Sequence, residues 1–134
     1  LWKSYKKPKR LNDLKDLPTV GYVQDMIFDK ELDYLEPLGL RRVQLASNSI
    51  SVQMNLLRQG AGLGIVHDFA LPFAPELRRI LTEHLSLTRS FFLIRSTDDR
   101  HNRRLNQFAQ VLVSGLRAEI QRLEALAEEP CGQI

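Results

Sequence analysis

The chain has 134 residues, of which 43% are apolar and 26% are charged, so the composition favours one globular domain and excludes a disordered segment. No apolar run reaches the roughly 18 residues of a membrane span, and the single cysteine, Cys131, excludes an internal disulfide and suits a reducing cytoplasm. Five of the basic side chains lie in the first ten residues, and the other 124 residues carry 14 basic and 16 acidic side chains. The net charge of +3 therefore belongs to one end of the chain, and a folded nucleic-acid-binding face is not expected.

The first part of the chain is expected to alternate helix and strand. After an irregular lead-in of residues 1–7, Asn12 can cap a short helical turn that Pro18 ends. Residues 19–23 are a β-branched and aromatic run, which is typical of a buried strand. A helix is predicted next over residues 29–39, because its apolar positions share one side and a glycine stands at its end.

The middle of the chain repeats this alternation. Residues 43–46 are predicted to form a strand, and the hydroxyl and amide groups of residues 47–49 can cap the helix that follows over residues 50–60. The apolar positions of this helix recur at i, i+4 and i+7 and define one buried face: Ile50, Met54 and Leu57. Gly60 ends the helix, and residues 63–66 form the next strand.

The last part of the chain is predicted to contain two strands and one long helix. The strands are expected at residues 77–81 and 90–95. The helix, capped by Asp98 or Asp99, runs from about residue 100 to about residue 128. Its apolar residues keep helical spacing: Leu105, Phe108, Leu112, Leu116, Ile120 and Leu123.

Strands that alternate with helices predict an α/β fold with a mostly parallel sheet and helices on both faces. Ligands of such sheets bind beyond the carboxyl ends of the strands, where helix N-termini present free amide groups. The residues expected there form the candidate effector-binding site: Tyr22, Gln24, Asp25, Ser47, Asn48, Ser49 and His67. The expected ligand is a small polar or anionic molecule, and Asp25 would select against extra negative charge.

No catalytic, cofactor or metal site is predicted. The glycine-rich stretch 60–64 follows a helix and opens a strand, whereas a phosphate-binding loop has the opposite order. The three histidines do not form a metal-ligand spacing, and the serines of residues 47–49 lack the context of a nucleophile. A small α/β enzyme stays open as an alternative, which a cluster of ionisable groups with shifted pKa values would favour.

Residues 8 to about 116 resemble the effector-binding domain of LysR-type transcription regulators. The most telling motif is the helix-to-strand segment of residues 57–66, Leu-Arg-Gln-Gly-Ala-Gly-Leu-Gly-Ile-Val. Further segments follow in the order of the family: residues 14–17, 20–23, 47–50, 77–81, 91–95 and the helix from Arg103. The chain departs from the family at His67, where proline is usual, and in the extension beyond Leu123.

The resemblance implies a two-lobed fold like that of type 2 periplasmic binding proteins. Residues 1–7 would be a lead-in, residues 8–86 the second lobe, residues 87–123 the return to the first lobe, and residues 124–134 a tail. The rest of the first lobe and an N-terminal winged helix-turn-helix would precede this piece. The implied protein is a cytoplasmic bacterial regulator that forms homo-oligomers (dimers or tetramers), needs no cofactor or membrane, and contacts DNA only through that helix-turn-helix. An exported solute-binding protein of the same fold is the other alternative.

Overall fold

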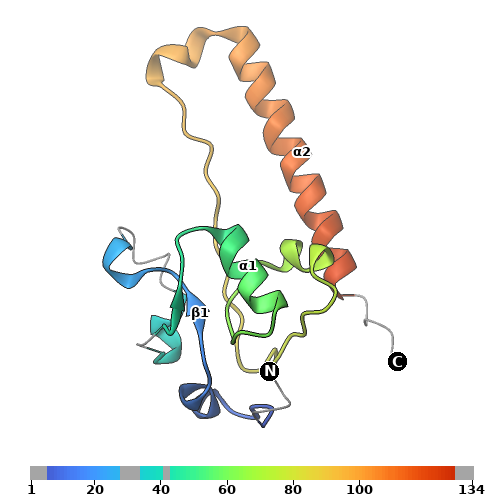
Figure 1. Ribbon diagram of the computed structural model, residues 1–134. Helices are drawn as coiled ribbons and strands as arrows, with labels where there is room; N and C mark the ends of the chain where they lie inside the picture. The colour runs from blue at the N-terminus through green and yellow to red at the C-terminus, as the bar shows by residue number, and fades with distance from the viewer. Residues whose placement is uncertain (1–5, 28–33, 41–42, 129–134) are drawn as a thin grey trace. The chain divides into compact units, whose positions relative to one another are not determined.

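The computed structural model describes most of the chain: residues 6–27, 34–40 and 43–128 (Figure 1). The chain divides into two compact units. Unit 1 comprises Leu1–His67 and Ala74–Leu87, and unit 2 comprises Asp68–Phe73 and Thr88–Ile134. No helix within the described ranges has the length and the apolar character that crossing a membrane requires.

Unit 1 is built on parallel backbone pairing, as the sequence predicted. Strand β1 (Val20–Gly21) pairs with strand β2 (Leu45–Ala46), so that Val20 lies opposite Leu45. On its other side the chain before β1 forms a parallel bridge between Thr19 and Leu63, and the Val20 amide donates to the Leu63 carbonyl oxygen over 2.7 Å. Three of the predicted strand segments therefore lie side by side and run in the same direction, although each pairs over fewer residues than expected.

The core of unit 1 forms where short helical segments cover these strands. Helix η1 (Leu11–Asp16) and helix η4 (Glu36–Leu38) are 3-10 helices. The buried leucines come from these segments and their ends: Leu14, Leu17, Leu35 and Leu40. Gly39 takes the left-handed conformation, with φ of 69°, that was predicted for the residue ending the helix of residues 29–39. The predicted start of that helix, including Leu32, lies outside the described residues.

The N-terminus of η1 is organised by Asp13 and not by Asn12, so the predicted cap was wrong. The Asp13 carboxylate accepts hydrogen bonds from the backbone amides of Lys9, over 2.9 Å, and of Arg10, over 3.0 Å. Arg10 is the residue that flanks the helix, in extended conformation. A carboxylate inside the first turn thus reaches back to the backbone amides that precede the helix, and Arg10 rather than Asn12 stands at the N-cap position.

Helix α1 (Ile50–Arg58) buries a different face from the one predicted. Leu57 is buried as expected, but Ile50 is 48% exposed and Gln53 is only 6% exposed. Gln53 can be buried because its side-chain amide donates to the Ser47 carbonyl oxygen over 2.5 Å. Gln53, hydrogen-bonded to Ser47, is therefore buried with Leu57 on the inner face of α1, where Ile50 was predicted to lie.

The glycine-rich stretch after α1 brings two segments of backbone close together. Gly60, with φ of 72°, ends the helix as predicted. A Cβ atom on Gly62 would lie 2.6 Å from the Pro18 carbonyl oxygen, and one on Gly64 would lie 3.0 Å from the Val20 carbonyl oxygen. The close approach of these two backbone segments therefore accounts for the glycines at 62 and 64.

The two strands predicted for residues 77–81 and 90–95 are absent from the described part of the chain, so that prediction was wrong. A strand needs backbone partners as well as apolar side chains. Residues 80 and 81 use their side chains to cover the unit 1 core, and Leu81 has a positive φ of 56°, which interrupts extended pairing. In residues 90–95 the apolar side chains are exposed, with Ile94 88% exposed.

Unit 2 is dominated by helix α2 (Arg103–Glu128), which confirms the long helix predicted for this region (Figure 1). Two 3-10 helices pack against it, η5 (Asp68–Phe73) and η6 (Thr97–His101). The predicted caps of the long helix, Asp98 and Asp99, were wrong: both lie within η6, and the Asn102 side-chain oxygen accepts a hydrogen bond from the Leu105 amide over 3.2 Å at the start of α2. Leu123 is the one residue of α2 that becomes fully buried among those described.

Candidate functional site

The loops that follow β1 and β2 are joined by hydrogen bonds, which places several predicted site residues together. The Ser47 amide donates to the Gly21 carbonyl oxygen over 3.0 Å. The Asn48 side-chain oxygen accepts from the Val23 amide over 3.2 Å, and its nitrogen donates to the Met26 sulfur over 3.3 Å. The carboxyl ends of these parallel strands therefore form one continuous edge, as the sequence predicted.

Helix α1 begins at this edge, but its first turn is not capped as predicted. Ser49 is the residue before the helix, and its side chain makes no capping hydrogen bond. Instead, the Ser47 hydroxyl accepts a hydrogen bond from the Ser49 amide over 3.1 Å. The side chains of Ser47 and Asn48 thus stabilise the loop through hydrogen bonds. The Ser49 side chain is exposed and makes no capping hydrogen bond.

Three aromatic rings form a row next to this edge. The Tyr22 and Tyr34 rings meet edge-to-face with centroids 6.3 Å apart, and the Tyr34 and His67 rings do so at 6.0 Å. Tyr22 and His67 were predicted site residues, but Tyr34 was missed, because it stands within the segment expected to be a helix. The only sequence signal for Tyr34 was an amphipathic ring next to the buried Leu35.

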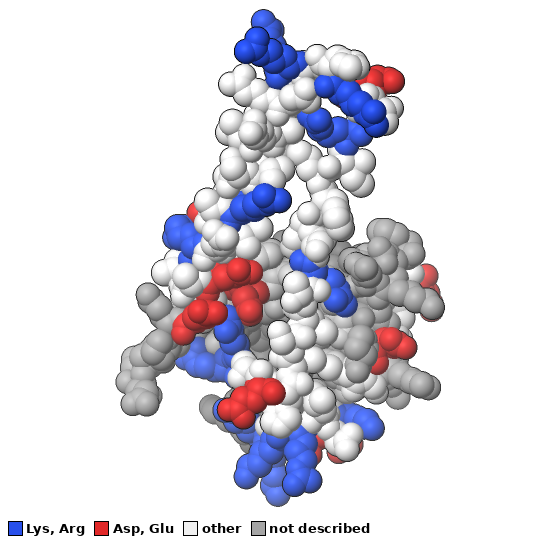
Figure 2. Space-filling model, turned by 180° about the vertical axis from the view of Figure 1, so that it is seen from behind, with Lys and Arg blue, Asp and Glu red and all other residues white. Residues whose placement is uncertain are grey.

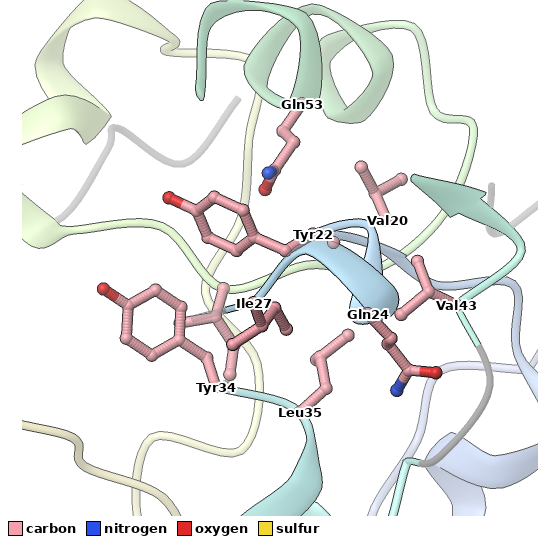
Figure 3. Close-up of a pocket in the computed structure, with 10 residues that line it drawn as sticks. Val20, Tyr22, Gln24, Ile27, Tyr34, Leu35, Val43 and Gln53 are labelled. Atoms are coloured by element: carbon pink, nitrogen blue, oxygen red, sulfur yellow. The ribbon is translucent and has the colours of Figure 1, made fainter. Parts of the chain in front are cut away.

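A small cavity opens beside Tyr22 and Tyr34 (Figure 3). It holds about 10 Å³ of free space, which is close to the minimum for one water molecule. Figure 3 shows the two tyrosine hydroxyls directed to the same side and the Gln53 amide pointing toward the Tyr22 ring. Its lining combines polar aromatic and aliphatic side chains: Val20, Gly21, Tyr22, Gln24, Ile27, Tyr34, Leu35, Val43, Gln53 and Ile65.

The seven predicted site residues are only partly brought together. Tyr22 and Gln24 line the cavity. The other five do not line it: Asp25, Ser47, Asn48, Ser49 and His67. Burial, and then the neighbouring Tyr34, raises the pKa of the Tyr22 hydroxyl, which keeps it protonated and able to donate a hydrogen bond.

A second cavity of about 80 Å³ lies in the core of unit 1. Leucine and isoleucine side chains make up most of its wall, and Leu35 and Ile65 also line the small cavity. Its one polar side chain, Thr19, donates its hydroxyl hydrogen to the Gln44 side-chain oxygen over 2.6 Å. Apart from this hydroxyl, the side chains that line the cavity are apolar, so its greater size does not make it the better site for a polar effector.

Potential metal ligands do not gather in the part of the chain that the structure describes, where no group of three or more histidine, cysteine, aspartate or glutamate side chains occurs. The acidic residue at the candidate site, Asp25, is exposed in the 3-10 helix η2 (Gln24–Met26). The polar groups that converge on the strand ends are therefore hydroxyl, amide and ring groups. Such groups bind a small molecule by hydrogen bonding and stacking.

Comparison with protein families gives a match to the family described as LysR substrate binding domain, over residues 2–117. Comparison with curated proteins gives no match. Comparison with solved structures gives none either. The match covers most of the chain, including β1, β2, α1 and the first part of α2. Because it agrees with the parallel strands and with the polar edge at their carboxyl ends, this chain belongs to the LysR substrate binding domain family.

Proposed function

We propose that this chain is the effector-binding part of a LysR-type transcription regulator and that it binds a small polar or anionic molecule without catalysing a reaction. The observation that carries the proposal is the joining of the β1 and β2 ends by the Ser47 and Asn48 hydrogen bonds. This edge stands where ligands bind in parallel sheets of other α/β proteins. Membership of the LysR substrate binding domain family supports a small-molecule effector as the class of ligand.

The proposed effector site extends the seven predicted residues by Tyr34. Tyr22, Tyr34 and His67 supply ring faces and edges for an unsaturated or apolar part of the effector. Ser49 and the first amides of α1 supply hydrogen-bond donors for a polar or anionic group, and the first turn of α1 contains no acidic residue. Ser47 and Asn48 hold the loop that presents these donors, and the exposed Asp25 disfavours effectors with additional negative charge.

The effector site is proposed to lie on the second lobe of the domain and to be completed by the first lobe. The cavity of about 10 Å³ holds no molecule larger than water, so binding requires either a facing surface or a rearrangement of Tyr22 and Tyr34. We assign residues 8–86 to the second lobe and residues 87–123 to the return to the first lobe, with residues 124–134 as a tail. The boundary between compact units after Leu87 supports this division, whereas the assignment of Asp68–Phe73 to unit 2 departs from it.

In this proposal the remaining parts of the regulator lie upstream of the chain and include a winged helix-turn-helix that binds DNA. The regulator is cytoplasmic and homo-oligomeric. An effector that prefers one arrangement of the lobes shifts the population of oligomer shapes, and through it the contacts with DNA. The slightly acidic balance of the chain after residue 10 supports a sensing role without DNA contact.

Replacing Ser49 tests the effector site. The full-length regulator is assayed with a promoter reporter against a panel of small carboxylates, and the active inducer is then titrated by calorimetry. Ser49→Ala is expected to weaken inducer binding about tenfold or more, while the free energy of unfolding stays within about 0.5 kcal/mol because no cap is lost. Ser51→Ala, an exposed serine in α1, is the matched control. Unchanged inducer affinity in Ser49→Ala would show that the effector binds elsewhere.

A further inference from the structure

The core of unit 1 contains more free space than close packing leaves. The core cavity has a volume of about 80 Å³, whereas a protein interior has few voids larger than a water molecule. Such a void costs stability, because the side chains around it lose contacts with neighbouring atoms. Its wall includes Leu14, Leu35 and Leu40, which are all at most 7% exposed. The space therefore lies in the best buried part of the unit and is not a loosely packed edge.

The wall of the core cavity is suited to an apolar occupant rather than to water. The hydroxyl and the amide of Thr19 both donate to the Gln44 side-chain oxygen, over 2.6 Å and 2.7 Å. The Leu63 amide donates to the Pro18 carbonyl oxygen, and the Leu63 carbonyl oxygen accepts from the Val20 amide. Figure 2 shows charged side chains spread over one face of the molecule, whereas the described residues that line the cavity include none. Since a buried water molecule needs about two to four polar partners, the cavity favours a small apolar molecule.

A strained residue covers the core cavity. Leu81 has a positive φ of 56°, which is unfavourable for a leucine, and it lines the cavity together with Ile80 and Leu85. The Leu81 carbonyl oxygen accepts hydrogen bonds from the amides of His84 and Leu85, over 2.9 Å and 3.1 Å, so a short turn holds this cover in place. Backbone strain of this kind is frequent at sites that clamp a ligand. The turn of residues 81–85 is thus a cover whose rearrangement opens the cavity.

The core cavity shares a wall with the proposed effector site. Leu35 and Ile65 line both the core cavity and the small cavity beside Tyr22 and Tyr34. Closely packed interiors transmit strain, so an occupant that displaces either shared side chain changes the space beside the two tyrosines. Two ligands that bind on opposite sides of one wall are therefore coupled, and each changes the affinity for the other.

We propose that the core cavity is a second binding site, which takes a small apolar molecule or hydrocarbon group, and that its occupation changes the space beside Tyr22 and Tyr34. An apolar cavity of about 150 Å³ binds benzene or xenon. The core cavity has roughly half that volume, which suits a xenon atom or a group of about three or four carbon atoms. The binding stands independently of the proposed function, and only its meaning as regulation of effector binding rests on that function.

Xenon is the probe, and methyl and ring NMR signals of the 134-residue chain are the measurement. Dissolved xenon is expected to shift the methyl signals of Leu63 and Ile80 saturably and to leave those of Leu123 unchanged. The ring signals of Tyr22 and Tyr34 are expected to shift with the same concentration dependence, because the shared wall moves. Shifts that stay linear with xenon concentration, or that are as large at Leu123, would overturn the binding site. Ring signals that do not respond would overturn the coupling.

Two substitutions change the size of the core cavity in opposite directions. Leu38→Phe adds atoms to the wall and is expected to weaken xenon binding about tenfold or more. Leu11→Phe is the matched control, since Leu11 is also half-buried and packs against the same core but is not among the residues that line the cavity. Ile80→Ala enlarges the cavity and is expected to admit benzene, which the unchanged chain excludes.

Thermal unfolding shows which variants are folded, and if one of them is not, the other decides by itself. Unchanged xenon affinity in Leu38→Phe, an equal loss in Leu11→Phe, or benzene binding that is the same with and without Ile80→Ala would each overturn the proposal. Neither probe requires the effector, and none of the three substituted residues belongs to the proposed effector site. Failure of the xenon experiment would therefore leave the effector site standing, and unchanged inducer affinity in Ser49→Ala would leave the core cavity standing.

Discussion

In unit 1 the segments that touch come from distant parts of the chain, whereas in unit 2 a single helix of 26 residues supplies most of the regular structure. Thr19 and Val20 are at most 2% exposed. The Thr19 amide donates a hydrogen bond to the Gln44 side chain, and the Val20 amide donates one to the Leu63 carbonyl oxygen. In α2 only Leu123 is comparably buried among the described residues. A single substitution at a buried residue of unit 1 should therefore lower the free energy of unfolding more than one in α2, because it disturbs more neighbouring residues.

The largest effect is expected where a charge replaces a buried residue of unit 1. Leu57→Asp should lower the free energy of unfolding by about 4 kcal/mol or more, because an unpaired carboxylate would be buried against Gly64. Arg58→Asp, one residue further along α1, removes only the half-exposed ion pair with Glu76 and should cost about 1 kcal/mol or less. Urea unfolding measures both variants, and equal midpoints would contradict the assigned buried face of α1.

A smaller effect is expected for the covered side of α2. Leu123→Ala should lower the free energy of unfolding by about 2 kcal/mol, since the side chain is 8% exposed and its removal leaves a cavity. Leu116→Ala, on the same helix but 54% exposed, should change it by less than about 0.5 kcal/mol. Thermal unfolding compares the two. A large loss in Leu116→Ala would mean that the exposed part of α2 is covered in solution.

The smallest effect concerns pH and the start of η1. Hydrogen bonds from the Lys9 and Arg10 amides lower the pKa of the Asp13 carboxyl. Because the folded-state pKa is below the unfolded value of about 3.9, the stabilisation is present above that pH and is lost as the pH falls through the folded-state pKa. The free energy of unfolding of Asp13→Asn should therefore be lower than that of the unchanged chain near pH 7, and the two values should converge in acid. Urea unfolding at several pH values measures both. Asn12→Ala should have little effect, and a larger effect than Asp13→Asn would restore Asn12 as the cap.

The sequence predicted the parallel neighbours of unit 1 because short apolar runs, glycine stops and alternation carry that information locally. It also predicted α2, whose apolar spacing persists over seven turns. It was wrong for residues 77–81 and 90–95, where apolar runs resemble strands but the structure describes no pairing with another strand. Pairing is a property of two segments, and one segment alone does not reveal it.

The candidate site was predictable in position but not in detail. The order of strands and loops placed Ser47, Asn48 and Ser49 at the carboxyl ends of the strands, and the hydrogen bonds of Ser47 and Asn48 confirm that place. Which of these side chains makes which hydrogen bond depends on side-chain geometry. The Ser47 hydroxyl accepts a hydrogen bond from the Ser49 amide, and the Ser49 side chain does not cap α1. Tyr34 joins the site through ring contacts with residues far away in the sequence, which no local pattern contains.

The wall shared by the two cavities of unit 1 has a consequence for how this protein can evolve. Leu35 and Ile65 face the core cavity on one side and the space beside Tyr22 on the other. Substituting valine or methionine at these two positions would alter the shape of the proposed effector site without changing its polar groups. In the proposed site, ligand preference could thus drift through changes in the interior, and the free volume of about 80 Å³ behind the wall gives such changes room to be accommodated.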